Sequence, residues 1–119
     1  MKVAITSQGP DLNSPLDPRF GRAKYLLVVD LETNELVVHD NAQNASALQG
    51  AGIQAARAVA DLGASAVITG HVGPKAFVTL DAAGIAVYTD VHGTVADAVA
   101  QLKSAQLALT EKANVEGHW

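Results

Sequence analysis

The chain has 119 residues with a formal net charge of −4, and 49% of them are hydrophobic although only 4% are aromatic. This length fits one domain whose core is built from small aliphatic side chains. The acidic balance argues against a general nucleic-acid-binding face. The absence of cysteine excludes disulfides, thiolate nucleophiles and cysteine-ligated metal sites.

Membrane and export features are not visible in the sequence. No apolar run approaches the ~18 residues that a membrane span needs. The N-terminus enters a strand-like run within a few residues, without the pattern of a signal peptide. We therefore expect a cytoplasmic protein with neither nucleic-acid nor membrane partners.

The first half of the chain predicts three strands and two loops. Lys2–Thr6, Ala23–Leu31 and Leu36–His39 are apolar runs, and the last two should pair as a hairpin because only a polar turn separates them. The segment Ser7–Arg22 contains three of the four prolines and has no periodicity. A loop of this length is usually functional or disordered. A second polar loop spans Asp40–Gln49.

The second half alternates helices with strands. Helices are predicted over residues 50–62, 73–84 and 94–109, and strands over residues 66–69 and 85–88. Pro74 suits the first position of its helix, where its missing N–H costs nothing. Thr94 and Asp97 have the spacing of a capping box. Residues 1–109 should form a single domain, and residues 110–119 a polar, frayed C-terminal tail.

This alternation predicts an α/β fold with right-handed crossovers. The first, fourth and fifth strands should be parallel, with the second strand antiparallel to the first. Ligands bind such sheets at the carboxyl edge of the parallel strands. All three helix N-termini should point to this edge, each offering free N–H groups and the positive end of a helix dipole.

The segment Asp17–Lys24 (DPRFGRAK) concentrates positive charge at the same edge. Arg19, Arg22 and Lys24 are three of the eight basic residues in an acidic chain, and Lys75 begins the second long helix. Such a concentration indicates an anion-binding cleft. A solvated loop in which one arginine pairs with the neighbouring aspartate fits the composition equally well.

Other motifs at this edge are weaker. Gly50–Ala55 has the G-x-G-x-x-A spacing of a dinucleotide fingerprint, but it follows a loop instead of a strand, which makes dinucleotide binding a poor alternative. His71 and His92 follow adjacent strands and could converge on a metal, although loop histidines are more often hydrogen-bonded surface residues. His39 should face solvent, and His118 lies in the tail without an expected role.

The sequence does not predict an assembled catalytic site. No cluster of Asp and Glu falls at the sheet edge, as a two-metal nuclease would need. Ser7 and Thr69 have no paired base and acid. An enzyme acting on a phosphorylated metabolite is therefore the weakest of the functional hypotheses.

Three segments resemble the dinitrogenase iron–molybdenum cofactor biosynthesis family, of the NifX and NifB C-terminal type. They are DPRFGRA at Asp17–Ala23, GAGIQAA at Gly50–Ala56 and ITGHVGPKAF at Ile68–Phe77. The similarity extends to about Leu102. It implies a ribonuclease-H-like fold, with helices flanking a mixed five-stranded sheet of order 3-2-1-4-5. The chain most resembles the orange-protein branch of sulfate-reducing bacteria, whose members hold a molybdenum–copper sulfide cluster.

The resemblance implies carriage and not catalysis. An anionic metal–sulfide cluster brings its own sulfides, so it needs positive charge, N–H donors and an apolar cradle. The expected cofactor-binding residues are Arg19, Phe20, Gly21, Arg22, Lys24, Gly50, Gly52, Gly70, Val72, Gly73 and Lys75. Many family members have a histidine where this chain has Gln49, which makes His71 the better candidate metal ligand here, with His92 as the other.

Two functions of different kinds remain open. In the first, the chain is a non-catalytic carrier of a molybdenum–copper sulfide cluster or an iron–molybdenum cofactor precursor. It would act as a monomer or weak dimer, with a partner protein in cluster assembly. In the second, it is a cofactor-free regulatory module, and the same edge docks an acidic partner or a nucleotide-dependent ATPase. Arg19→Ala combined with Arg22→Ala should abolish cluster retention only if the first is correct.

Overall fold

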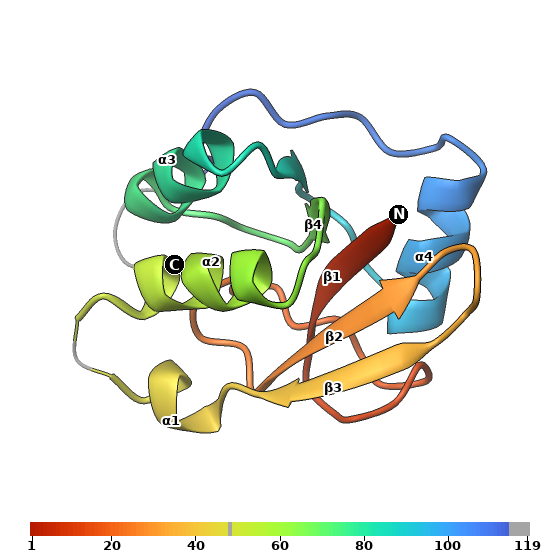
Figure 1. Ribbon diagram of the computed structural model, residues 1–119, viewed down its shortest axis with the longest axis horizontal. Coiled ribbons are helices and arrows are strands. Elements are labelled where there is room, and N and C mark those ends of the chain that lie inside the picture. The colour runs from red at the N-terminus through yellow and green to blue at the C-terminus, as the bar shows by residue number, and fades with distance from the viewer. Residues whose placement is uncertain (48, 115–119) are drawn as a thin grey trace.

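The computed structural model describes residues 1–47 and 49–114, so the expectation for His118 and the end of the tail lies outside the described residues. Figure 1 shows the order of the elements along the chain. They are β1 Lys2–Ser7, β2 Tyr25–Asp30, β3 Leu36–Asp40, α1 Ala42–Ala45, α2 Ala51–Asp61, β4 Ala66–Ile68, α3 Pro74–Ala82, β5 Ala86–Tyr88 and α4 Val95–Lys103. Within the described part, no helix has both the length and the apolar character to cross a membrane.

The five strands form one mixed sheet in the order β3-β2-β1-β4-β5. β1 pairs in parallel with β4, and β4 with β5, whereas β2 is antiparallel to both β1 and β3. Ile5 lies at the centre of this sheet, opposite Leu27 on one side and Ile68 on the other. The predicted fold class and strand order are therefore confirmed.

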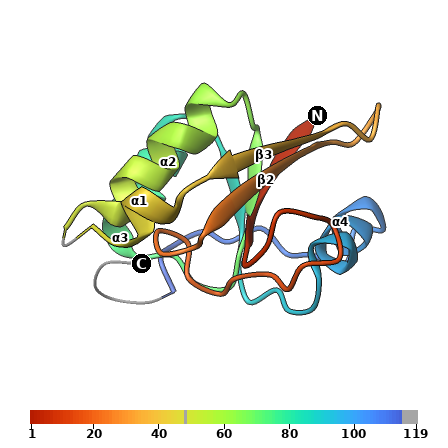
Figure 2. The ribbon, with the colours of Figure 1, turned by 90° about the horizontal axis from the view of Figure 1, so that it is seen from below.

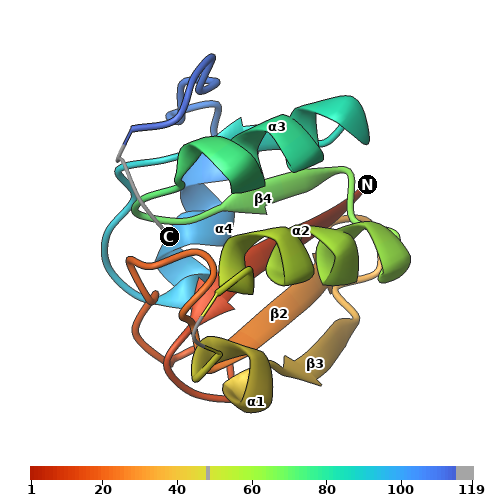
Figure 3. The same cartoon turned by 90° about the vertical axis from the view of Figure 1, so that its left-hand side faces the viewer.

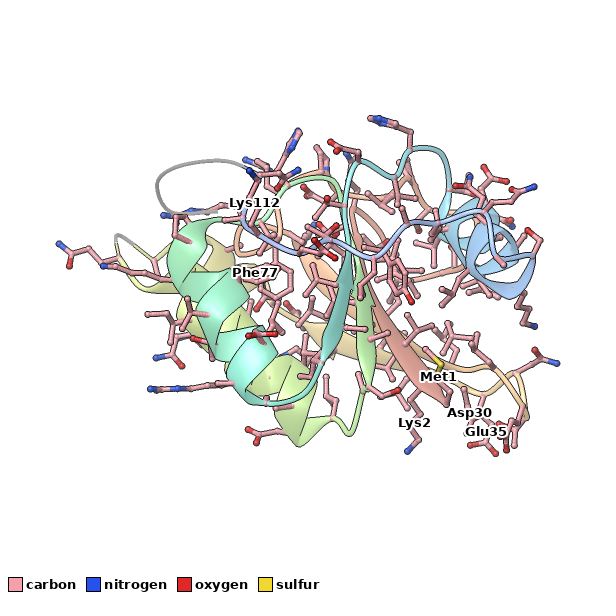
Figure 4. All side chains as sticks on the ribbon, turned by 90° about the horizontal axis from the view of Figure 1, so that it is seen from above. Met1, Lys2, Asp30, Glu35, Phe77 and Lys112 are labelled. Atoms are coloured by element: carbon pink, nitrogen blue, oxygen red, sulfur yellow. The ribbon has the colours of Figure 1, made fainter. Side chains whose placement is uncertain are left out.

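Helices cover the two faces of the sheet unequally. α2 and α3 lie side by side on one face, and α4 lies on the other (Figures 2 and 3). Successive strand residues point to opposite faces, so Leu26 packs in the core under α2 and α3 while Leu27 packs in the core under α4. Phe77 of α3 points toward the sheet (Figure 4).

Two elements differ from the sequence-based prediction. The loop predicted over residues 40–49 contains the short helix α1. α4 ends at Lys103 and not at Leu109, because Ala105 adopts a left-handed φ of 57°. No glycine or proline marks this end. The chain turns here because Leu107 packs against the core beneath α4.

The segment after α4 runs back along the outer edge of β5. The Thr110 N–H donates to the Val87 carbonyl oxygen at 2.7 Å. The main-chain N–H of Asn114 likewise donates to the Val72 carbonyl oxygen at 3.2 Å, so the segment predicted to fray is hydrogen-bonded at residues 110 and 114.

Candidate anion-binding site

Three loops meet at the carboxyl ends of β1, β4 and β5 (Figure 2). The long loop between β1 and β2 makes strand-like bridges to the others, pairing Pro15 with Thr94 and Arg19 with His71. The His71 N–H donates to the Pro18 carbonyl oxygen at 2.6 Å, and the Phe20 N–H donates to the His71 carbonyl oxygen at 3.1 Å. These bonds hold the basic segment against the loop that precedes α3.

A buried polar cluster anchors the start of the basic segment. The Thr6 hydroxyl lies 2.6 Å from the Asp17 carbonyl oxygen and 2.8 Å from the Thr69 hydroxyl. The Asp17 carboxylate is nearly buried and accepts the Arg19 N–H at 2.9 Å. The Ser7 hydroxyl donates to the Gly9 carbonyl oxygen at 2.7 Å. These hydroxyl groups therefore serve the structure of the loop, and none of these contacts activates a nucleophile.

Two glycines allow the basic segment to approach its neighbours closely. A Cβ atom on Gly21 would lie 2.6 Å from the Gly52 nitrogen, at the start of α2. A Cβ atom on Gly70 would lie 2.7 Å from the Pro18 Cα. Real Cβ contacts are essentially never this short. Close backbone packing alone thus requires glycine at both positions.

The N-termini of α2 and α3 lie on the same side of the molecule as the basic segment (Figure 3). Both helices begin without a side-chain cap, since Gly50 and Gly73 occupy the cap positions. Pro74 stands at the start of α3, as predicted. An uncapped helix end leaves backbone N–H groups available to an anion. Lys75 is exposed in the first turn of α3 and adds positive charge there.

The basic side chains of the site have different surroundings. The Arg19 side chain is about half exposed, and its Nε lies 3.5 Å from an Asp17 carboxylate oxygen. Lys24 is exposed, with its ammonium group 5.8 Å from the centre of the Tyr25 ring. Lys112, in the segment that follows α4, lies at this end of the sheet as well (Figure 4). Lys112 follows the last predicted helix, so the sequence gave no reason to place it among the cations at this end.

Arg22 differs from the other cations because it donates to backbone carbonyl groups of another segment. Its guanidinium donates to the Ala45 carbonyl oxygen at 3.2 Å and to the Ala47 carbonyl oxygen. These acceptors lie at the end of α1, where helical carbonyl groups lack partners. Arg22 therefore ties the basic segment to the stretch that precedes α2, which sequence spacing alone does not reveal.

The apolar cradle predicted from Phe20 and Val72 has no exposed surface. Both side chains are fully buried in the core beneath α2 and α3. Phe20 turns inward because its backbone is paired with the loop after β4. In this conformation neither side chain can face a ligand, so the predicted apolar cradle of Phe20 and Val72 is absent from the surface.

The two candidate metal ligands lie in different loops. His71 is partly buried, and its Nδ1 lies 3.4 Å from Nδ2 of Asn114. His92 is exposed in the loop after β5. Within residues 1–47 and 49–114, no group of three or more His, Asp or Glu side chains could hold a metal ion.

Comparison with known proteins identifies the family. Residues 1–105 match the family model described as dinitrogenase iron–molybdenum cofactor, and the chain belongs to this family. The fold matches the apo form of the orange protein from Desulfovibrio gigas, with 42% sequence identity, 96% coverage of each chain and a TM-score of 0.93.

Two further relatives are more distant. A putative NifB protein from Thermotoga is 34% identical, with 98% of each chain covered and a TM-score of 0.85. An uncharacterized protein of Methanocaldococcus jannaschii is 33% identical over 92 residues, which span 74% of this chain and 73% of the relative.

Proposed function

We propose that this protein is a non-catalytic carrier of an anionic molybdenum-containing sulfide cluster. The observation that carries the proposal is the pair of uncapped helix N-termini, α2 and α3, beside the exposed cations Arg19 and Lys75. Backbone N–H groups and cations stabilise an anion together, because charge-assisted hydrogen bonds are the stronger ones.

The chemistry of the donors favours a cluster with its own sulfide ligands. The chain has no cysteine to supply a thiolate. A metal–sulfide anion needs none, because its sulfur atoms already saturate the metal and accept hydrogen bonds at the surface. A molybdenum–copper composition is the cargo implied by the resemblance to the orange-protein branch, and the family description makes an iron–molybdenum precursor the other candidate.

Reconstitution with tetrathiomolybdate and copper tests this proposal. After desalting, the wild-type protein should retain stoichiometric molybdenum and a new charge-transfer band in the visible spectrum. Arg19→Gln combined with Lys75→Gln should lose most of both. A matched control is Lys2→Gln combined with Lys103→Gln, which removes the same charge from exposed positions outside the site and should behave as the wild type does.

Other outcomes would change the assignment. Equal loss in both double variants would mean that net charge, and not the site, holds the cluster. A colourless, molybdenum-free wild-type protein would contradict the carrier function. It would instead favour docking of an acidic or nucleotide-dependent protein partner at the same end.

A further inference from the structure

The segment that follows α4 returns to the proposed site, where Asn114 is the last residue that the structure describes. Thr110 pairs with the outer edge of β5, and its hydroxyl accepts the Thr89 N–H at 3.0 Å. Four residues later, Asn114 makes hydrogen bonds to the loop between β4 and α3 through both its main chain and its side chain.

Two backbone groups fix the orientation of the Asn114 carboxamide. Its Oδ1 accepts the Val72 N–H at 2.8 Å, and its Nδ2 donates to the Gly70 carbonyl oxygen at 3.1 Å. Exchanging the oxygen and the nitrogen would set donor against donor and acceptor against acceptor. The amide nitrogen must therefore be the atom that lies on the His71 side.

The second hydrogen of this amide nitrogen has two potential partners. Nδ1 of His71 lies 3.4 Å from Asn114 Nδ2, and Oδ1 of Asp90 lies 3.5 Å from it. A proton on the histidine Nδ1 would oppose the amide N–H group. The contact thus favours Nδ1 as the acceptor, with the proton of a neutral imidazole on Nε2.

We infer that Asn114 is a positioning residue that holds His71 in the Nε2–H form. His71 then offers an N–H donor to the anionic cargo, and not a lone pair to a metal. This inference rests on the proposed function only for the identity of the cargo. Ligation of a metal by His71 would require either a proton shift away from Nε2 or displacement of Asn114.

The tautomer can be measured on the cluster-free protein. Nitrogen-15 shifts of the histidine rings distinguish protonated from unprotonated ring nitrogens, and His71→Gln assigns the resonances. At about pH 8.5, where imidazole is neutral in model peptides, the wild-type protein should show His71 with an unprotonated Nδ1 and a protonated Nε2. Asn114→Ala removes the amide N–H that faces Nδ1, so the share of His71 with an unprotonated Nδ1 should fall in this variant.

A second exposed asparagine provides a control. Asn13→Ala makes the same change in the long first loop and should leave the His71 shifts as in the wild type. The inference is overturned if the wild-type His71 carries its proton on Nδ1, or if Asn114→Ala leaves the tautomer populations unchanged. Each result stands whether or not the protein binds a cluster, so it is independent of the proposed function.

A double-mutant cycle then tests whether Asn114 acts through His71. The Nε2 amide of glutamine places an N–H donor near the position of histidine Nε2 without depending on Asn114. His71→Gln should therefore keep the affinity for tetrathiomolybdate within about threefold. Asn114→Ala should weaken it by about fivefold in the wild-type background and by less than about twofold in the His71→Gln background.

The cycle also separates the donor role from metal ligation. If His71→Gln abolishes molybdenum and copper retention, His71 is a metal ligand and the inference fails. If Asn114→Ala weakens binding by the same factor in both backgrounds, Asn114 acts on the loop and not through the histidine, which likewise overturns it.

Discussion

The helix N-termini on the two faces of the sheet differ in their side-chain caps. On one face, α2 and α3 begin at Gly50 and Gly73, which have no side chain to cap the first turn. On the other, α4 begins with a complete capping box: the Thr94 hydroxyl accepts the Asp97 N–H at 3.1 Å, and the Asp97 carboxylate accepts the Thr94 N–H at 3.0 Å.

This difference shows how one sheet edge can hold a site on a single face. At α4 the capping box satisfies backbone N–H donors of the first turn, and the Asp97 carboxylate adds a negative charge that repels an anion. At α2 and α3 no side chain caps the first turn, and Arg19 and Lys75 are exposed cations. The fold brings all three helix ends to the edge, and the proposed site uses the two that have no side-chain cap.

The largest expected effect comes from filling the contact between the basic segment and α2. In Gly21→Ala the new Cβ would lie 2.6 Å from the Gly52 nitrogen, which should lower the free energy of unfolding by about 2 kcal/mol and abolish cluster retention. Urea unfolding and molybdenum analysis measure the two effects. Gly84→Ala is the control, because nothing lies within 4 Å of its Cβ and only its φ of 74° is unfavourable.

That control should cost roughly 1 kcal/mol and leave cluster retention unchanged. If both variants lost the cluster equally, loss of stability alone would explain the result. The close approach of the basic segment to α2 would then have no special part in binding.

Reversing one charge at the open face should have the next largest effect. Lys75→Glu keeps the stability of α3, since an acidic side chain suits a helix N-terminus, but it should weaken tetrathiomolybdate binding about tenfold. Lys103→Glu makes the same charge change in the last turn of α4. Titrations of both variants at low salt should show a loss only for Lys75→Glu, and equal losses would contradict the assigned face.

Removing the cap of α4 should affect stability alone. Thr94→Ala deletes the hydroxyl that accepts the Asp97 N–H, which should lower the free energy of unfolding by about 1 kcal/mol. Denaturant unfolding measures this cost. A parallel change in cluster affinity would mean that the α4 terminus belongs to the site after all.

The smallest expected effect concerns the carboxylate of Asp30, at the end of the sheet opposite the proposed site (Figure 4). The hydrogen bond donated by the Glu32 N–H to Asp30, at 2.9 Å, lowers the pKa of that carboxyl below its ordinary value of 3.8. Because the folded-state pKa is the lower one, the stabilisation is complete above the unfolded-state value and is lost as the pH falls through the folded-state value. Asp30→Asn should remove this acid-dependent part of the stability, while cluster retention at neutral pH stays constant.

An NMR titration of the Asp30 carboxyl provides the direct check. A pKa at or above 3.8 would contradict the contribution of this turn. Asp30 is only partly buried, so the effect on the whole protein should be slight.

Most helix boundaries follow from local features of the sequence, whereas the order of the strands was implied by the family resemblance. Pro74 and the Thr94–Asp97 pair each specify a helix start through their own backbone chemistry, and the structure has both. Gly63 and Gly84 adopt the left-handed φ values expected of residues that end helices. Such features act within a few residues and can be found without knowing the fold.

The parts of the site that were not predicted depend on distant contacts. Arg22 looks like any other loop cation until the Ala45 and Ala47 carbonyl groups are placed beside it. Phe20 looks available to a ligand until its backbone pairs with His71 and turns the ring into the core. Asn114 is an ordinary tail residue in the sequence, and only the turn at Ala105 brings it back to the loop before α3.

The route of the last described residues has a consequence for anyone who purifies this protein. Asn114 is hydrogen-bonded at the proposed site, so an affinity tag added after residue 119 would start within about 20 Å of it, even with the intervening chain extended. A run of tag histidines there could bind copper and imitate a loaded carrier. Met1 lies at the opposite end of the sheet (Figure 4), and a tag placed before it would keep foreign imidazoles away from the cargo.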